Sequence, residues 1–565
     1  MPTNLEDRDY ASTQTLYTSI SQNASKCGDV DALIYYGNHI NYNSFLDEIH
    51  ACAAGLIANG VKSGDRVSIY LPNIPQCVIA IYAVNMIGAI CNMIHPLSTQ
   101  SELEHAIKIS KSEFVLACEI NEYLCSNKDI VVIRCGLPTY FPTTFKGKII
   151  KLAYNTKLSY DRIIRKKCVP VKNVRKVTEW TTLIADGHKY ISESGIPEVQ
   201  SNPRDTAVIM YTGGTTGESK GVMLSSTAFN ILKIQLYYSI FGNVSADGDK
   251  YLEVLPLFHA FGLIVLHTPL SYGRTCYLLP RFDPKECASL ILKEKIQYLM
   301  GVPAMYNLMY SRLLDQDLSF IKVIVAGGDS ASESSVNRYN QLLKQGNNRI
   351  KFRFGYGLTE ACSVFSITGD DYNSFTAGWI GKPLIWNELC TVEPGTTNVI
   401  PNGQIGELCV RSLSVMNGYY DNPSATADVI KVHEDGKEWL HTGDIVEVDP
   451  NSGDIYFKSR YKRMIKVNGY NVYPMMIETT MRKHPDIVDV CAVGIETRRG
   501  TRIKLYVSLN RKIDPDKAER KIIRYASKHL NRWSIPVSVE IISSFPRTKM
   551  NKIDYKALEL MASGS

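Results

Sequence analysis

Short apolar runs that end in small, polar turns recur along the chain and predict buried strands. Residues 207–212 (AVIMYT) form one such run, and the pattern of residues 222–241 (VMLSSTAFNILKIQLYYSIF) suits a helix. The most apolar stretch, residues 78–94, is 17 residues long and is interrupted by two asparagines and one glycine. These interruptions favour a buried helix over a membrane span.

A glycine-rich segment separates the first of these strands from the helix. Residues 211–221 (YTGGTTGESKG) contain four glycines, three threonines and Lys220. Glycine lets backbone N–H groups approach a phosphate closely, and the hydroxyls and the lysine add further donors. The common phosphate-loop pattern is not met, because Gly221 rather than Ser or Thr follows Lys220. A flexible linker is the alternative, but the order strand, glycine loop, helix favours a phosphate site.

Two later runs each predict a strand that ends in a turn of small residues. They are residues 324–330 (IVAGGDS) and 352–361 (FRFGYGLTEA). In the second run Tyr356, Thr359 and Glu360 emerge together. An aromatic ring can stack on a base, a hydroxyl can hydrogen-bond a phosphate, and a carboxylate can bind Mg²⁺. The run therefore indicates one side of a nucleotide site.

Two further candidate residues each keep a structural alternative. Asp444 in TGD could accept hydrogen bonds from paired ribose hydroxyls, or it could cap a turn. His259 in LPLFHAFG lies among aromatic residues, where a histidine is either functional or part of the packed core. Residues 449–454 (DPNSGD) predict a hairpin turn rather than a calcium loop. A helix is expected to begin near Pro474.

Composition limits the classes that remain. A chain of 565 residues predicts at least two domains, and 45% hydrophobic with 21% charged residues is typical of a globular protein. The net charge of +7 permits anionic ligands without indicating nucleic acid. The 14 cysteines show no C-x-x-C pair and no cysteine–histidine cluster at zinc spacing. With no signal-peptide pattern at the N-terminus, we expect a cytoplasmic protein with reduced thiols.

One segment departs from the average charge. Residues 146–176 carry eleven Lys and Arg against a single acidic residue, with aromatic and aliphatic residues interleaved. A solvated face is the simpler interpretation. The alternative is weak peripheral contact with an anionic membrane, which would suit a lipid-like substrate.

The motifs, in this order, resemble the adenylate-forming superfamily, which includes acyl-CoA synthetases, aryl-CoA ligases, peptide-synthetase adenylation domains and firefly luciferase. The resemblance spans about residues 35–558 and includes the glycine-rich loop, YGLTE, TGD, SRYKRMIKVNGY and the C-terminal PRT with NK. It implies an enzyme that couples a carboxylic acid to ATP, giving an acyl-adenylate and pyrophosphate, and then transfers the acyl group to a thiol. ATP, Mg²⁺ and CoA are the implied small molecules.

The resemblance also implies a role for each matched residue. The nucleotide loop comprises Thr212, Gly213, Gly214, Thr215, Thr216, Gly217 and Lys220, whose threonines and lysine hold the β- and γ-phosphates. Adenine is enclosed by Tyr356 and the backbone of Gly327, Gly328 and Asp329. Gly357 and Thr359 also bind the nucleotide, with Thr359 at the α-phosphate. Ribose is bound by Asp444 and Arg460, and Mg²⁺ by Glu360 and Thr216. The residues assigned to catalysis are Lys552, which reaches the α-phosphate and the substrate carboxylate, Glu360, Thr359 and His259.

The implied fold is α/β, with a large multi-sheet N-terminal adenylation domain (residues 1–459) and a small, mobile α+β C-terminal domain (residues 464–565). A hinge at residues 460–463, centred on Lys462, would let the small domain rotate between the two half-reactions. In the rotated state Lys466 and Gly469 would line the tunnel for the pantetheine arm of CoA. This rotation would separate adenylation from thioester formation.

The identity of the acid is inferred from the motif around His259. Relatives that activate amino acids carry an Asp just after the aromatic residue of this motif, where it pairs with the substrate ammonium; here that place is His259. Residues 95–107 also resemble the fatty-acyl and coumarate branch. We therefore expect an acid–CoA ligase for a medium- or long-chain fatty acid. The alternatives are a free-standing enzyme that loads a carrier protein and a non-catalytic nucleotide-binding relative.

Overall fold

The chain divides into two compact units in the computed structural model. The model describes residues 5–24, 26–163, 168, 170–212, 219–242, 248–467, 470–497, 500–510, 514–547 and 553–563. The first unit comprises Met1–Phe375, Gly381–Glu388 and Arg411–Ile430. The second unit comprises Thr376–Ile380, Leu389–Val410 and Lys431–Ser565. Each unit is described by itself.

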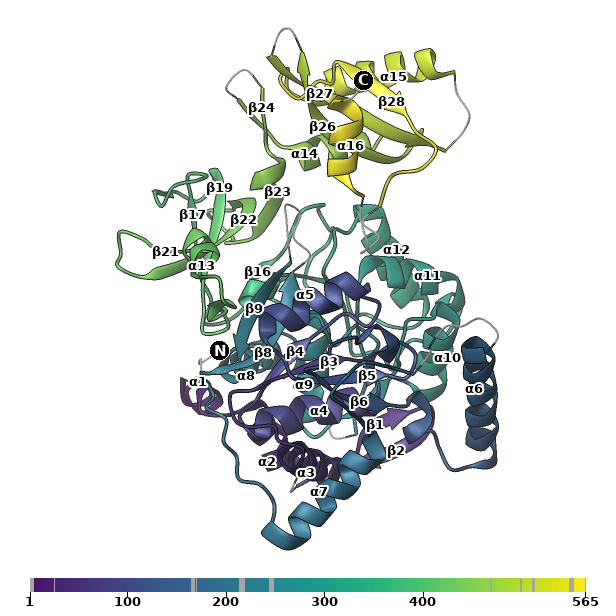
Figure 1. The fold of residues 1–565 in the computed structure, drawn as a ribbon. Helices are drawn as coiled ribbons and strands as arrows, with labels where there is room; N and C mark the ends of the chain where they lie inside the picture. The colour runs from purple at the N-terminus through teal and green to yellow at the C-terminus, as the bar shows by residue number, and fades with distance from the viewer. Residues whose placement is uncertain are drawn as a thin grey trace. The chain divides into compact units, whose positions relative to one another are not determined.

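An eight-stranded sheet forms one half of the first unit (Figure 1). In spatial order its strands are β20 (Gly418–Tyr419), β9 (Lys220–Ser225), β8 (Thr206–Thr212), β4 (Ile90–Met93), β3 (Arg66–Tyr70), β5 (Phe114–Cys118), β6 (Val131–Cys135) and β7 (Lys176–Glu179). The strands from β8 to β7 are parallel, whereas β9 runs antiparallel to β8 and to β20. The hairpin and β20 therefore close one edge of a parallel sheet.

A nine-stranded sheet forms the other half of the first unit. Its order is β16 (Lys382–Pro383), β15 (Ser366–Ile367), β14 (Arg353–Tyr356), β13 (Val323–Ala326), β12 (Tyr298–Gly301), β10 (Lys250–Glu253), β11 (Thr275–Leu278), β1 (Asp31–Tyr35) and β2 (Asn38–Asn41). All neighbours from β14 to β1 are parallel. The carboxyl ends of these strands consequently lie along one edge of the sheet.

Helices of the first unit pack against both sheets and against one another. They are α1 (Leu5–Ser12), α2 (Leu16–Ala24), α3 (Tyr42–Ala58), α4 (Pro75–Met86), α5 (Gln100–Ser110), α6 (Phe145–Ile163), α7 (Trp180–Ser194), α8 (Ser226–Leu236), α9 (Ala260–Ser271), α10 (Pro284–Glu294), α11 (Pro303–Leu313), α12 (Glu333–Gln345) and α13 (Pro423–Val429). Every residue of α4 is buried, and His267 of α9 contacts Tyr82 of α4 (3.2 Å) and Asn230 of α8 (3.1 Å). These polar contacts join three apolar helices in the core.

The most apolar stretch folds as a buried helix only in its first half. Helix α4 ends at Met86, and Gly88 turns the chain with a φ of +71° before β4 begins at Ile90. Glycine adopts this left-handed angle without steric cost, which explains the break. No helix in the described part of the chain is long and apolar enough to cross a membrane.

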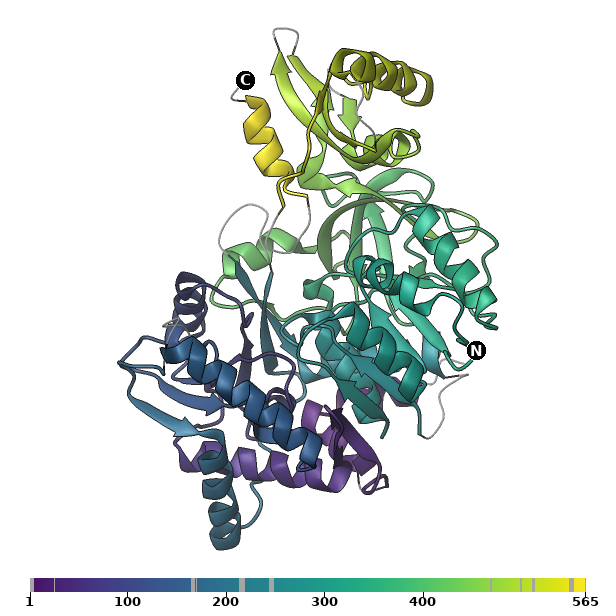
Figure 2. The same ribbon diagram turned by 90° about the vertical axis from the view of Figure 1, so that its right-hand side faces the viewer.

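The second unit contains a curved antiparallel sheet and a small α+β part (Figure 2). The first sheet is β18 (Val399–Ile400), β17 (Glu388–Val392), β19 (Ile405–Arg411), β22 (Glu438–Val448) and β21 (Ile430–Val432), with β23 (Ile455–Arg460) also paired to β22. The rest comprises β24 (Ile465–Val467), β25 (Tyr470–Val472), α14 (Pro474–Met481), β26 (Ile487–Thr497), β27 (Gly500–Leu509), α15 (Pro515–His529), β28 (Ser538–Ile541) and α16 (Tyr555–Ser563).

Side chains alternate across the small three-stranded sheet of β26, β27 and β28. Leu505 packs in the core formed with α14 and α15, whereas Tyr506 packs on the opposite face with Leu558 of α16. This alternation follows from the two-residue period of a strand. The mixed α/β fold with a larger N-terminal and a smaller C-terminal part is confirmed. The boundary at residue 459 and the hinge at residues 460–463 remain predictions.

Candidate active site

The glycine-rich segment connects two antiparallel strands, which corrects the expected order of strand, loop and helix. Thr212 at the end of β8 pairs with Lys220 at the start of β9, and the Ser219 hydroxyl donates to the Thr212 carbonyl at 2.7 Å. Helix α8 begins only at Ser226, after β9. Residues 213–218 lie outside the described residues, and with them the predictions for Gly213, Gly214, Thr215, Thr216 and Gly217.

Lys220, Tyr419 and Glu360 come together from three separate segments of the first unit. The Lys220 ammonium lies 4.6 Å from the centre of the Tyr419 ring, and the Tyr419 hydroxyl donates to Glu360 Oε1 at 2.8 Å. Strand β20 brings Tyr419 beside β9, because Tyr419 pairs with Val222. The structure thus joins two predicted site residues through an aromatic residue that the sequence analysis did not identify.

Tyr419 is suited to hold the Glu360 carboxylate in place. Burial of its hydroxyl, together with the nearby charge of Glu360, raises the pKa of Tyr419, so the hydroxyl remains a donor at neutral pH. Glu360 belongs to the 3₁₀ turn η4 (Thr359–Ala361), and its backbone carbonyl accepts from the Met416 N–H at 2.9 Å. Nothing in the sequence around Tyr419 indicated that it contacts Glu360.

The surroundings of Glu360 fit a magnesium ligand. Its side chain is half-buried, and in the part of the chain that the structure describes it forms no ion pair. A carboxylate held by one hydroxyl and not neutralised by a cation can accept a divalent ion. Mg²⁺ would there polarise the phosphate oxygens and neutralise their charge.

The two small-residue turns lie side by side at the carboxyl edge of the nine-stranded sheet. Strands β13 and β14 are parallel neighbours, and Ala326 pairs with Phe354. Residues 327–329 follow β13, and residues 357–360 follow β14, which ends at Tyr356. Ligands of open α/β sheets bind outside the carboxyl ends of the strands. The expected strand-to-turn transitions are confirmed, and the structure brings both turns to the same edge.

Gly357 allows the second turn to pass very close to another segment of backbone. A Cβ atom at this position would lie 1.4 Å from the Ser363 carbonyl oxygen, so a side chain cannot fit without moving the main chain. Gly328 in the neighbouring turn has a φ of +77° and faces solvent. Glycine is therefore needed at position 357 because there is no space for a side chain, and it is favoured at position 328 because of the left-handed backbone angle.

His259 follows β10 in the same sheet and directly precedes α9. Its ring lies 4.5 Å from that of Phe258, which in turn lies 4.3 Å from His95. His259 is half-buried rather than part of the core. A Cβ atom at Gly327 would come within 3.5 Å of Phe261, so this motif reaches the turn after β13. The catalytic role of His259 remains a prediction.

Asp444 and Arg460 meet in the second unit. Asp444 on β22 pairs in register with Arg460 on β23, and Arg460 Nε lies 2.7 Å from Asp444 Oδ1. The Asp444 side chain is fully buried, whereas that of Arg460 is 54% exposed. The carboxylate is thus held by the arginine at the edge of the sheet. The structure brings these two predicted residues together, and their role in binding ribose remains a prediction.

A bulge in β22 places Asp444. Gly443 has a φ of +68° and donates its N–H to Glu407 Oε1 at 3.1 Å, while the Thr442 hydroxyl donates to the Leu408 carbonyl at 2.8 Å. The register between β19 and β22 shifts at this point. An extra residue in one strand redirects the side chains that follow it. The hairpin turn at 449–454, predicted from the sequence, is confirmed between β22 and β23.

The predicted hinge and tunnel residues lie further along the second unit. Lys462 is exposed on the 3₁₀ turn η5 (Tyr461–Arg463), beside Arg463, whose Nη2 lies 2.6 Å from Glu478 Oε1. Lys466 is exposed on β24. Gly469 and Lys552 lie outside the described residues, so their roles stay predictions.

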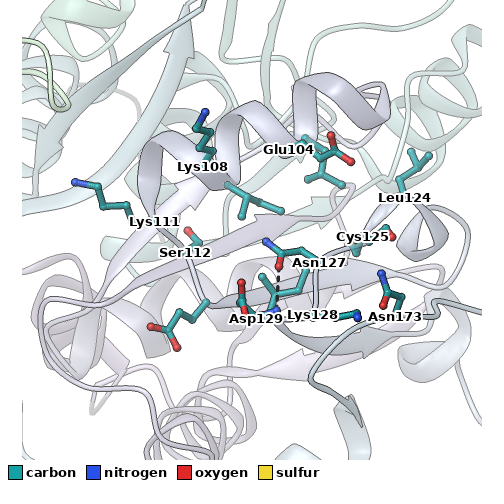
Figure 3. A pocket seen from close by; sticks show the side chains of 15 residues that line it. Glu104, Lys108, Lys111, Ser112, Leu124, Cys125, Asn127, Lys128, Asp129 and Asn173 are labelled. Carbon is teal, nitrogen blue, oxygen red and sulfur yellow. Dashed lines mark hydrogen bonds between the residues drawn. The ribbon is translucent and has the colours of Figure 1, made fainter.

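The first unit has a surface cavity on a different set of residues. It is lined by α5 and the segment around residues 124–130, where Asn127 Oδ1 accepts from the Asp129 N–H at 2.9 Å (Figure 3). None of the predicted site residues lines it. We therefore do not assign the nucleotide to this cavity.

Comparisons with known proteins agree with these motifs. A family model described as AMP-binding enzyme matches residues 20–420, and one described as AMP-binding enzyme C-terminal domain matches residues 476–552. A long-chain-fatty-acid–CoA ligase of Bacillus subtilis is 28% identical over 556 residues, covering 96% of this chain and 93% of that protein. The 4-coumarate–CoA ligase-like 2 protein of Arabidopsis thaliana is 28% identical over 535 residues, covering 93% and 86%.

A solved structure supports the fold over nearly the whole length. ATP-bound MatB from Rhodopseudomonas palustris superposes with a TM-score of 0.76 at 21% identity, covering 97% of this chain and 99% of that chain. The expected resemblance to adenylate-forming enzymes of the acyl-CoA synthetase branch is confirmed. On the match of residues 20–420, the chain belongs to the AMP-binding enzyme family.

Proposed function

We propose that this AMP-forming acid–CoA ligase activates a medium- or long-chain fatty acid. The acid attacks the α-phosphate of ATP, giving an acyl-adenylate and pyrophosphate, and the thiol of CoA then displaces AMP. The contact of Lys220 and Glu360 with the same Tyr419 side chain carries the proposal. A cation over the ring and a carboxylate at its hydroxyl are the two groups that phosphate and Mg²⁺ need, which supports the adenylation step of the proposal.

The remaining nucleotide contacts follow from the two turns and the β22 bulge. Tyr356 stacks on adenine against the backbone of residues 327–329, and Thr359 contacts the α-phosphate. Asp444 and Arg460 bind the ribose in the second unit. Lys220 holds the β- and γ-phosphates, and Lys552 neutralises charge where the two anions approach each other. Cations at this point lower the barrier because the reaction brings a carboxylate to a phosphate.

Two observations support an uncharged, apolar acyl group. The position that would carry a counter-ion for an amino acid is His259, which lies against Phe258. Helix α9, which follows it, is apolar and almost entirely buried. The curated relatives include long-chain-fatty-acid–CoA ligases, and the 4-coumarate–CoA ligase-like protein makes a hydroxycinnamic acid the main competitor.

A pyrophosphate-release screen tests this function. Purified full-length protein is mixed with ATP, Mg²⁺ and a panel of fatty acids of increasing length, 4-coumarate and amino acids, with and without CoA. We expect release with the fatty acids and an acyl-CoA product by mass spectrometry. Pyrophosphate release with 4-coumarate alone would reject a fatty acid as the substrate. In a parallel assay with a phosphopantetheinyl carrier protein, acyl transfer to that protein and not to CoA would reject CoA as the acceptor. ATP binding without release for any acid would identify a non-catalytic relative.

A further inference from the structure

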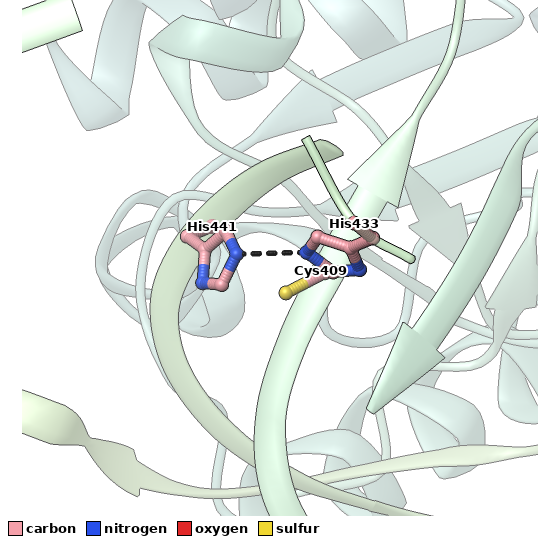
Figure 4. A group of neighbouring side chains, drawn as sticks. All are labelled: Cys409, His433 and His441. Atoms are coloured by element: carbon pink, nitrogen blue, oxygen red, sulfur yellow. Dashed lines mark hydrogen bonds between the residues drawn. The ribbon is translucent and has the colours of Figure 1, made fainter. Parts of the chain in front are cut away.

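A compact group of cysteine and histidine side chains lies inside the curved sheet of the second unit. Cys409 comes from β19, His441 from β22, and His433 directly follows β21. All three side chains are buried, with residue exposures of 0%, 6% and 6%. Their ligand atoms lie within 4.8 Å of one another, and Figure 4 shows one nitrogen of each imidazole ring pointing toward the other ring, with the Cys409 sulfur nearby.

Three atoms of the types that bind zinc lie next to one another. His433 Nε2 and His441 Nε2 are 2.9 Å apart, and the Cys409 Sγ lies beside them. Zinc binds imidazole nitrogen at about 2.0–2.1 Å and thiolate sulfur at about 2.3 Å. Two nitrogens and one sulfur that already lie this close can reach such distances with small side-chain movements.

The far side of one imidazole ring lies near a carboxylate, and that of the other lies near a sulfur. Glu407 Oε2 lies 3.4 Å from His441 Nδ1, and the Cys390 Sγ lies 4.0 Å from His433 Nδ1. Imidazoles that bind metals usually have a carboxylate, a backbone carbonyl or water beside the second ring nitrogen. Glu407 lies in this position for His441, close to it but without a hydrogen bond in the structure. The two Nε2 atoms lie next to each other.

A metal-free hydrogen bond between the histidines is the competing explanation. It needs one Nε2 to carry a proton. The Glu407 carboxylate near His441 Nδ1 favours a proton on that nitrogen, which leaves His441 Nε2 able either to accept from His433 or to bind a cation. The Cys409 sulfur beside both nitrogens is a third metal-binding atom, and it favours the cation.

We propose that Cys409, His433 and His441 bind one zinc ion. Cysteine with histidine selects zinc among the common divalent ions, because harder ions prefer oxygen ligands. The ion joins β19 to the β21–β22 hairpin. Glu407 links it to the bulge, because its Oε1 accepts from Gly443, next to Asp444. The zinc site would therefore stabilise the segment that presents Asp444.

Metal content of the full-length protein gives the direct test. Protein produced with added zinc and purified without chelators should carry about one zinc ion per chain, measured by plasma mass spectrometry. After chelator treatment, Co²⁺ should restore binding and give thiolate-to-cobalt charge-transfer absorption. Wild-type protein that carries no zinc and gives no such absorption would overturn the proposal.

Variants locate the ion. His433→Gln and Cys409→Ser should each weaken zinc binding by at least about tenfold in competition with a metal-sensitive dye, and Glu407→Gln by about tenfold. His188→Gln on α7 and Cys27→Ser, which remove the same ligand types elsewhere, should bind as wild type. Zinc affinity unchanged in His433→Gln and Cys409→Ser, or a disulfide between Cys390 and Cys409 in the purified protein, would reject the site. Circular dichroism of His433→Gln checks folding independently of metal binding.

Discussion

The Tyr419 hydroxyl donates a hydrogen bond of 2.8 Å to Glu360 Oε1, while the same ring lies 4.6 Å from the Lys220 ammonium. Tyr419→Phe removes only the donor and leaves the ring. Because a hydrogen bond to a charged group is worth about 1.5–3 kcal/mol, we expect ATP turnover to fall by about tenfold or more. The Mg²⁺ concentration needed for half-maximal turnover should rise, measured by pyrophosphate release.

Two further variants serve as controls for Tyr419→Phe. Tyr420→Phe makes the same change at the next residue and should leave the Mg²⁺ dependence unchanged. Glu360→Gln removes the carboxylate charge at nearly constant shape and should affect turnover more strongly than Tyr419→Phe. Glu360→Gln with normal turnover across a Mg²⁺ titration would exclude Glu360 as a metal ligand.

Lys552 is expected to act in the first half-reaction only. Lys552→Ala should reduce adenylate formation by about 100-fold or more, the scale for losing one preorganised transition-state donor. Thioester formation from a supplied acyl-adenylate should stay close to that of wild type. The two rates are measured separately by pyrophosphate release and by acyl-CoA appearance, and equal losses in both would assign the lysine a structural role.

The hinge prediction can be tested at Lys462, which is exposed on η5. Proline fixes φ near −65°, so Lys462→Pro should restrict a hinge that must adopt two backbone states. We expect near-normal pyrophosphate release in a single turnover and acyl-CoA formation reduced by about tenfold or more. Lys462→Ala keeps φ free and should be mild. An alanine variant as defective as the proline variant would place the hinge elsewhere.

The first part of the basic segment, up to Ile163, forms helix α6. Phe145, Ile149, Leu152 and Tyr160 are 81%, 51%, 67% and 50% exposed, and their spacing puts them on one face of the helix. Exposed lysines flank this face. An apolar stripe between lysines suits an anionic lipid surface.

We predict salt-sensitive binding of the protein to anionic vesicles, with no binding to neutral ones. Reversing the charge of Lys148 and Lys151 to Glu should abolish flotation with anionic vesicles. The same reversal of Lys521 and Lys528 on the basic helix α15 is the matched control and should have little effect. If both double variants float equally well, the α6 lysines do not bind the membrane and belong to a solvated face.

The sequence predicted features that depend on neighbouring residues. The turns after β13 and β14, the hairpin turn at 449–454 and helix α14 beginning at Pro474 all follow from local patterns of glycine, proline and apolar residues. The expected helix after the glycine loop was wrong in its first residues, because β9 pairs with β8 and β20, and such pairing overrides local helix preference.

Contacts between distant segments could not be predicted in this way. Tyr419 reaches Glu360 only because β20 joins the edge of the eight-stranded sheet. Cys409, His433 and His441 do not match zinc spacing along the chain, since β19, β22 and the turn after β21 bring them together. Spacing rules detect metal sites on a single turn or hairpin, and they miss sites assembled across a sheet.

Gly357 and Gly443 are glycines for different reasons, so a library of variants should tolerate different substitutions at the two positions. A Cβ at Gly357 would meet the Ser363 carbonyl at 1.4 Å, so even alanine should be eliminated at this position. Gly443 has a φ of +68° with nothing within 4 Å of its Cβ position, so asparagine, which tolerates left-handed angles, should survive selection there. A growth- or binding-based selection that recovers Gly443→Asn but not Gly357→Ala would show that Gly357 is restricted by the space around it and Gly443 by its backbone angle.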